Sequence, residues 1–539
     1  MTISGVSGRT SYIGSGILDL RSQLDTLTQQ LSSGKVSNTY AGEGSGRSLA
    51  IALRAQLSSF ASYADTATNL NTRIGVANLS LQRLVTIGSE VKGAAVSAGS
   101  NFDNTGQTPG QKTASLDFFD SVDMLNAKSG DRYLFSGRAT DTAPVAPADQ
   151  IMNGNGAAIA GLKTVIAQRA QADLGTAGMG HILVSQPTAT SIQIGEDFAA
   201  DPTATPPVAA TPFGMKITAV STTSTTATVT QPTPTPAAAT PPSPVAMSVE
   251  LGATNPKEGD QFKFTLKMPD GTSEDIVLTA SSATPLPANS FQIDQGQPTA
   301  VPPVAPSSSV TTASLNTALG TAVKALANGP MVAASAIQAG NDFFGQPPMR
   351  VAGAPSNTAT STALVAGTAA DTVIWYNGEQ NTAANGSARG SAVSQLDTSI
   401  TVQYGARADE QALRSQLQTV AVFAAVSVDP AQLSNANYAQ NANAQIAALN
   451  QRVAQNLATI PGTQTIQDIQ ADFAGAQSTI KSTTDRQTQT KAMTETMLDS
   501  IEGINNDEVA TKILALQTAL QASYQTTSKL YQMSLVKFL

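Results

Sequence analysis

Cysteine is absent from the sequence, and histidine occurs once, as His181. The absence of thiols excludes disulfides, thiolate catalysis and any zinc or iron–sulfur site that uses cysteine ligands. A single histidine excludes a HExxH metalloprotease and any metal centre built from several histidines. We expect His181 to be an exposed or hydrogen-bonded loop residue. We also expect a protein that is not an enzyme and that binds no metal or cofactor.

Charged residues and long apolar segments are also scarce. Charged residues make up 13% of the 539 residues, the formal net charge is −8, and no stretch collects five or more basic residues. A nucleic acid or an anionic membrane binds to clustered basic residues, so we expect neither as a partner. The longest apolar run, VAVFAAV at 420–426, is much shorter than the about 20 residues that span a bilayer.

The sequence offers no pattern of a catalytic or nucleotide-binding motif. The glycine-rich GEGSG at 42–46 is not followed by GK[ST], and it predicts a flexible loop. The acidic PDGTSED at 269–275 lacks the ligand spacing of a calcium loop, and it predicts a hairpin turn. Asp117 and Asp120, in DFFDSVD, are expected to lie on a solvated helix face.

Each end of the chain predicts a helix with one narrow apolar stripe. The apolar residues recur at intervals of three and four, which is typical of a helix that packs against a partner helix. A helix with a single stripe is marginal alone and gains stability by burying that stripe. We therefore expect both ends to become ordered on assembly, partly against each other and partly against neighbouring subunits. The predicted assembly interface consists of Ile17, Leu20, Leu24, Leu27 and Leu31 in the first stripe and Val509, Ile513, Leu516, Leu520 and Leu530 in the second.

Further helices are expected between these ends and the middle of the chain. The apolar spacing predicts helices at about 53–84, 111–128, 406–426, 439–458 and 464–502. We expect these inner helices to form an intramolecular bundle.

The middle of the chain, about 138–404, has a different composition. Residues 202–306 contain 18 of the 28 prolines, which predicts extended linkers rather than helices. In DQFKFTLKMPDGTSEDIVLTAS, apolar residues alternate with polar ones on each side of an Asp-Gly turn, which predicts a β-hairpin. DTVIWYNG at 371–378 and SITVQYG at 399–405 predict two more strands.

These patterns together predict an α+β fold. We expect an elongated helical rod or coiled coil built from both chain termini, with a β-rich central insert. The expected parts are terminal coiled-coil helices at 1–42 and 505–539, a helical bundle rod at 43–140 and 405–504, and a variable insert of one or two subdomains, with proline-rich linkers, at 141–404.

The stretch GDRYLFSGRATDTAPV at 130–145 places neighbouring apolar residues in a chain that has only 5% aromatics. We expect Tyr133, Leu134 and Phe135 to form an apolar plug that ends the N-terminal helical half. The plug would seal the end of the rod where the chain leaves for the insert. The other interpretation is a simple hydrophobic contact that caps a helix.

Three stretches resemble the flagellin superfamily of bacterial axial proteins. LTQQLSSGKVSN, with the glycine loop and SLAIALRAQL that follow, is similar to the family's turn between its first two helices. GDRYLFSGRATDTAPV is similar to the segment before the family's variable insert, and EVATKILALQTALQASYQTTSKLYQMSLVKFL is similar to its C-terminal helix. The last two stretches most resemble the hook-associated proteins of the hook–filament junction. The similar parts, about 1–145 and 400–539, cover roughly half of the chain.

The resemblance implies a structural protein of the bacterial flagellum that joins the hook to the filament outside the cell. Such proteins pass unfolded through a narrow export channel without a cleaved signal peptide, and the initial MTISGVSGRTSYIGSG lacks the pattern of such a signal. They then assemble head to tail around an axis. The implied partners are copies of the chain, other flagellar axial proteins (the hook-side junction protein and flagellin) and an export chaperone.

Two other functions stay open at this point. A flagellin, which shares the N-terminal motif, would form the filament itself. A surface-exposed adhesive module on a flagellin-like stalk would bind through the insert, with the strand around the single tryptophan, Trp375, as its binding face. Packing of Trp375 in a core is the competing expectation.

Overall fold

The computed structural model is an α+β protein, in which 54% of the residues are helical and 15% lie in strands. The expected fold class is confirmed at this level, with helices at both ends of the chain. The chain divides into two compact units, which are described separately. The structure describes residues 4–97, 99, 101–156, 158–197, 211–232, 244–297, 299–300, 302–380 and 382–536, without the side chains of 4–11 and 534–536. Much of the expected proline-rich linker sequence, at 198–210 and 233–243, therefore lies outside the described residues.

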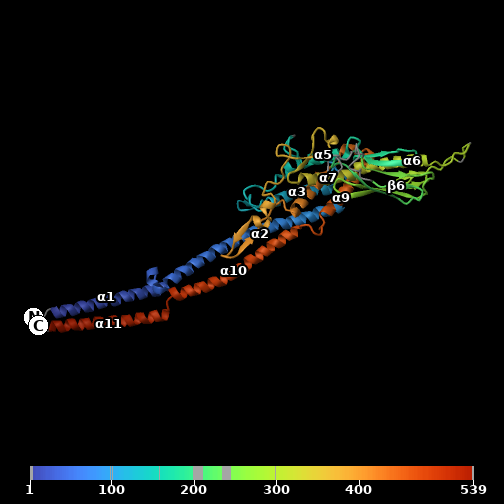
Figure 1. Cartoon of the computed structure of the whole chain (residues 1–539). Coiled ribbons are helices and arrows are strands. Elements are labelled where there is room, and N and C mark those ends of the chain that lie inside the picture. Colours follow the sequence, from blue (N-terminus) through green and yellow to red (C-terminus); the bar gives the residue numbers. More distant parts are fainter. Residues whose placement is uncertain are drawn as a thin grey trace. The chain divides into compact units, whose positions relative to one another are not determined.

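The first unit consists of Met1–Thr72, Ser394–Val402 and Gly475–Leu539. It contains the helices of the two chain ends, α1 (Ser4–Ser33) and α11 (Asn506–Val536). These two helices pack against each other in antiparallel orientation, so that the start of α1 lies beside the end of α11 (Figure 1). Residues from opposite ends of the sequence thus share one helix pair.

A glycine ends α1. Gly34 has a φ of 68°, in the left-handed region that a side chain disfavours, and its N–H donates to the Gln30 carbonyl over 2.8 Å. The chain then forms a 3-10 helix, η1 (Tyr40–Gly46), which contains the GEGSG stretch. η1 is interrupted by a kink at Gly44, which has a φ of 60°, so the glycine-rich stretch is a kinked connection made of two short helical turns.

Two long helices contribute residues to both units. They are α2 (Arg47–Ser97), which contains the predicted helix at 53–84, and α10 (Ile466–Glu502). The segment Ser394–Val402 belongs to the first unit because it is bonded to α10. The Arg486 guanidinium donates to the Asp397 carboxylate over 2.6 Å, and the Gln487 amide donates to the Leu396 carbonyl.

The second unit, Arg73–Val393 and Gln403–Ala474, begins its helical core with α3 (Pro109–Leu125) and α8 (Gln411–Ala425). A capping box between Thr108 and Gln111 starts α3. The VAVFAAV run forms the buried end of α8, and α8 packs against α3. The apolar run is thus explained by burial inside the protein.

Helices also occur within the predicted β-rich insert, which the sequence analysis did not expect. The chain between 141 and 404 forms four α-helices in the described residues, and α7 packs against α5 and also against α8 and α9, which follow residue 404. The bounds are α4 (Ala148–Asn153), α5 (Leu162–Leu174), α6 (Ser308–Asn328), α7 (Pro330–Phe343) and α9 (Ala436–Asn456).

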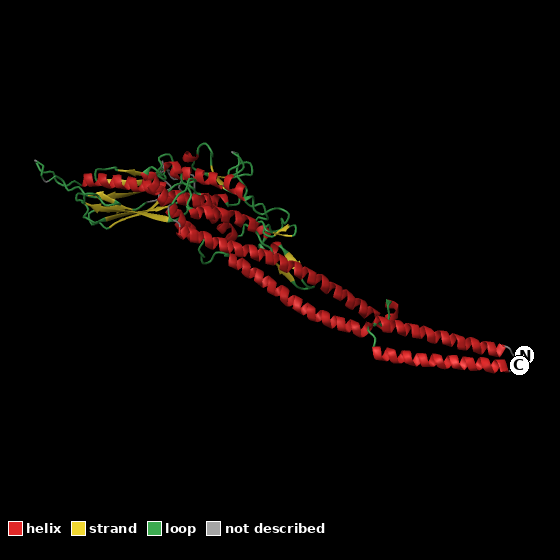
Figure 2. Ribbon diagram, turned by 180° about the vertical axis from the view of Figure 1, so that it is seen from behind, coloured by secondary structure: helices red, strands yellow, loops and turns green. Residues whose placement is uncertain are grey.

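Two four-stranded sheets complete the second unit (Figure 2). The strand orders are β10-β9-β8-β5 and β3-β4-β7-β6, and the neighbours are antiparallel except for the parallel pair β9 and β10. The predicted hairpin is confirmed as β8 and β9. The bounds are β3 (Ile182–Ser185), β4 (Ser191–Glu196), β5 (Lys216–Thr222), β6 (Thr228–Thr230), β7 (Ala246–Glu250), β8 (Gln261–Lys267), β9 (Ser273–Ser281) and β10 (Ser290–Gln292).

One hydrophobic core joins both sheets to α6. The alternating residues of β8, Phe262, Phe264 and Leu266, are buried in it, as the period of a strand with one covered face requires. Leu315 and Leu319 of α6 are buried in the same core.

One of the predicted strands is wrong. Residues 371–378 form no strand; only Thr372 and Tyr376 make isolated bridges, to Ala160 and Val145. Trp375 is 1% exposed and donates its ring N–H to the Phe344 carbonyl, so it is a core residue and not a binding face. The remaining strands are β1 (Lys128–Ser129), β2 (Arg132–Tyr133), β11 (Met349–Val351), β12 (Leu364–Ala366), β13 (Val393–Gln395) and β14 (Thr401–Gln403), the last within the predicted 399–405.

Candidate assembly interface

The stripe predicted on α1 lies on the side of the helix that is partly covered. Ile17, Leu20, Leu24 and Leu27 are half-buried, whereas the residues between them are exposed. Since α11 is the helix that packs on α1, contact with α11 accounts for this periodic burial. Leu31, at the end of the stripe, is 41% exposed.

The stripe predicted on α11 follows the same pattern. Val509 and Leu520 are buried, and Ile513 and Leu516 are half-buried. Leu530, near the end of the helix, is 37% exposed. The two stripes are therefore largely used within one chain, in the contact between α1 and α11.

A second set of large apolar residues on these helices is more than half exposed. The predicted stripes did not include them. The available signal was their aromatic content in a chain poor in aromatics, and Tyr524 and Tyr531 also continue the helical spacing of the second stripe, four residues after Leu520 and Thr527. The set consists of Tyr12, Leu18, Leu514, Tyr524, Tyr531 and Met533. We call this set the outer apolar residues.

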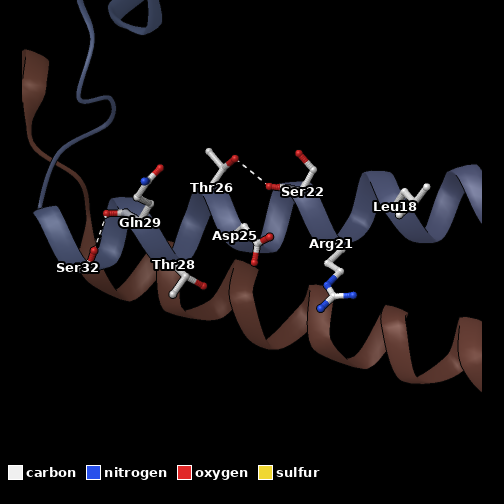
Figure 3. Close-up of a pocket in the computed structure, with 8 residues that line it drawn as sticks. All are labelled: Leu18, Arg21, Ser22, Asp25, Thr26, Thr28, Gln29 and Ser32. Carbon is white, nitrogen blue, oxygen red and sulfur yellow. Dashed lines mark hydrogen bonds between the residues drawn. The ribbon is translucent and has the colours of Figure 1, made fainter.

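The outward face of α1 around Leu18 is otherwise polar. An open hollow of about 610 Å³ is lined by residues of this one helix alone. Figure 3 labels these residues. The Thr26 hydroxyl donates to the Ser22 carbonyl within the helix. Arg21 and Asp25 have exposed side chains. Because a single helix provides every lining residue, the hollow does not enclose a small molecule as a binding pocket does.

An ionic cluster holds together the two turns of the first unit that follow α1 and α10. The Arg54 guanidinium makes two bonds to the Glu502 carboxylate, of 2.7 and 2.6 Å, and the Lys35 ammonium lies 3.5 Å from it. Glu502 is buried, and the donation by Arg54 lowers the pKa of its carboxyl and raises the pKa of Arg54. The Val36 N–H donates to the Glu502 carbonyl and the Ile504 N–H to the Gly34 carbonyl.

The predicted plug lies in the second unit, and its three residues differ in how far they are buried. Phe135 is fully buried, and its carbonyl accepts from the Ala408 N–H over 2.8 Å. Tyr133 and Leu134 are half-buried, and the Lys128 ammonium lies 4.3 Å from the centre of the Tyr133 ring. Phe135 is thus a core residue, and its two neighbours reach the surface.

The titratable residues discussed in the sequence analysis are buried or bonded to other side chains or to the backbone. His181 is buried; its Nε2 lies 2.6 Å from the Ala172 carbonyl and its Nδ1 2.8 Å from the Asp197 carboxylate, which confirms a hydrogen-bonded histidine. The solvated face expected for Asp117 is wrong, because Asp117 is buried and desolvation raises the pKa of its carboxyl. Asp120 accepts from Arg83 over 2.6 Å.

The described part of the chain contains no group of three or more metal-ligating side chains. Within the same residues, no helix is both long and apolar enough to cross a bilayer.

Comparison with known proteins adds no assignment. No protein-family model matches the sequence, and no curated protein matches it significantly.

Proposed function

We propose that this chain is a structural protein of the bacterial flagellum that joins the hook to the filament. It would lie outside the cell after export in an unfolded state without a cleaved signal peptide. The resemblance of three stretches to the flagellin superfamily supports this proposal, and so does the pairing of the two chain ends in α1 and α11. In this proposal the paired ends form an elongated coiled-coil rod.

The observation that carries the proposal is the exposure of apolar side chains on helices that are already paired. Leu514 of α11 is 63% exposed and Tyr531 is 60% exposed. Large apolar side chains gathered on one surface indicate contact with another protein. Neighbouring copies would cover them, and the hook-side junction protein and flagellin would be the partners at the two ends of the layer. An export chaperone would cover them before assembly.

The first prediction tests this surface by motility. Leu514→Ser, Tyr524→Ser and Tyr531→Ser, combined, should abolish swimming and release filament subunits into the medium, because neighbouring copies lose their apolar contacts. Swimming speed and secreted filament protein are measured in a strain that carries only the variant. Leu183→Ser, which removes an exposed apolar residue from β3 in the second unit, is the control and should swim normally. Normal filament retention by the triple variant would count against the proposal.

Flagellin is the second candidate, and one experiment separates the two. A flagellin polymerises by itself into long filaments when seeded in high salt, whereas a junction protein stops at short assemblies. Long filaments of the purified chain in the electron microscope would favour flagellin.

A further inference from the structure

α3 carries an exposed patch of apolar and acidic residues in the second unit. Leu116 is 74% exposed and Phe119 is 43% exposed. Asp123 lies one turn after Phe119, so the three side chains share one face of the helix. Among the described residues the Asp123 carboxylate has neither a hydrogen-bond nor an ion-pair partner. We call Leu116, Phe119 and Asp123 the α3 patch.

The apolar surface continues beyond α3 onto α2. Arg83 of α2 donates to Asp120 of α3 over 2.6 Å, which brings the two helices together beside the patch. Leu79 lies one turn before Arg83 and is exposed. Exposed large apolar residues on neighbouring helices indicate a docking surface.

A complementary groove of about 420 Å³ lies in the same unit. Its apolar lining residues include the buried Ile74 of α2, the half-buried Leu134 of the predicted plug and Val393 of β13, which is 53% exposed. Three arginines, Arg73, Arg132 and Arg138, line it as well. We call this the arginine groove. The aromatic residues that line the groove are Tyr133, Tyr404 and Phe473.

Two of the three arginines of the groove, Arg132 and Arg138, have exposed side chains that carry positive charge. Arg132 is exposed, and within the described part of the chain its side chain has no ion-pair partner. Arg138 pairs with Glu379 over 2.8 Å, but its side chain is 58% exposed. Arg73 donates to the Tyr404 hydroxyl over 3.3 Å. The chain as a whole has a net charge of −8, so this group of arginines is a local exception. A positively charged groove favours an acidic partner surface.

We propose that the α3 patch of one copy docks into the arginine groove of a second copy. Leu116 and Phe119 cover Leu134 and Val393 of the groove, and Asp123 pairs with Arg132. The second copy is the favoured occupant because its own α3 patch combines the apolar side chains and the negative charge that the groove requires. The two surfaces are different, so the contact is heterologous and repeats from copy to copy instead of closing a dimer. The inference rests on the proposed function, to which it adds a contact outside α1 and α11.

The absence of cysteine from the native sequence allows a direct test. Full-length chains that carry Phe119→Cys and Leu134→Cys, one substitution each, are mixed and exposed to a mild oxidant; Leu134 lines the groove and its substitution leaves Arg132 in place. The expected result is a disulfide-linked dimer that contains one chain of each kind. Phe119→Cys mixed with Leu183→Cys, an exposed position on β3, is the matched control. The inference is overturned if the first pair forms dimers no faster than the control, or if Phe119→Cys alone dimerises as fast.

A charge exchange tests the pairing of Asp123 with Arg132. Asp123→Arg and Arg132→Asp alone should each slow cross-linking between Phe119→Cys and Leu134→Cys chains about tenfold, and Asp123→Arg in one chain with Arg132→Asp in the other should restore it. Added salt should slow the native pair. Failure of the exchanged pair to recover would contradict the proposed register. Circular dichroism of each variant shows that it is folded.

The failure of this inference is distinguishable from that of the proposed function. The triple variant at Leu514, Tyr524 and Tyr531 leaves both surfaces of the second unit intact. Normal filament retention by that variant, with the cross-link still formed, would refute the proposed function alone. No cross-link, with filament loss in the triple variant, would refute the α3 contact alone.

Discussion

At the scale of single residues, buried charges in this protein hold segments together. Arg169 of α5 bonds to Asp173 over 2.9 Å and to Asp342 of α7 over 2.6 Å, and its guanidinium lies over the Phe213 ring. Every one of these side chains is at least nine-tenths buried, and removal of one partner would leave an unpaired buried charge. These charged groups thus bind α5, α7 and Phe213 together.

Glu502 gives a pH-dependent prediction at this scale. Its pKa is lowered from the usual 4.5 by the bonds from Arg54, so its stabilisation is present above that value and is lost as the pH falls through the lowered one. Glu502→Gln should reduce the protection of the Val36 and Ile504 amides at pH 7 by about 1–2 kcal/mol, given the partial exposure of Arg54. Hydrogen exchange checks this. The difference from the native chain should shrink when both are examined well below pH 4.5; a constant difference would refute the role of ionisation.

At the scale of elements, periodic apolar residues predicted the long helices well. The steps of three and four residues placed 17–31 in α1 and 464–502 in α10, because a heptad pattern is a strong helical signal. α6 was missed because its stripe of Leu315, Leu319 and Val323 follows a proline-rich segment and is mixed with threonine. The prediction of a strand at 371–378 was wrong. Its side chains are of types common in strands, but in the structure the segment is a loop that makes only two isolated bridges.

The candidate interface was predictable only in part. The heptad stripes of α1 and α11 indicated helices that need a partner, and those residues are buried or half-buried except Leu31 and Leu530. Which apolar residues are left outward, such as Leu18 and Leu514, depends on which side the partner helix takes, and a single sequence does not specify that. The arginine groove joins segments far apart in the sequence, so no local pattern revealed it. The α3 patch lies on one helix, but its exposure depends on which side of α3 packs against α8.

The outer edge of β5 gives a prediction at the element scale. β5 is the last strand of its sheet, and the Gln231 side chain bonds to both the N–H and the carbonyl of Val220 on that edge. Gln231→Ala should destabilise the second unit by about 1–2 kcal/mol because both backbone groups lose a partner. Urea unfolding followed by the fluorescence of Trp375, buried in this unit, measures the change. Gln186→Ala, which removes one exposed bond, is the control; an equal effect of both would refute the special role of Gln231.

At the scale of the whole molecule, the second unit has a large hydrophobic core, whereas the helices of the chain ends bury little surface. The second unit has the shared core of two sheets and α6, whereas α1 and α11 bury only one stripe each. Helices with a single covered stripe open easily in isolation and gain stability when further surface is buried. We therefore propose that the two ends stay adaptable until copies assemble around them.

Amide hydrogen exchange of α1 and α11, in the isolated chain and in the assembled state, tests this central claim most directly. In the isolated chain, their amides should exchange at least a hundredfold faster than those of α3 and α8, and assembly should slow them to a comparable rate. Equal and strong protection of α1 and α11 in the isolated chain, unchanged by assembly, would contradict it.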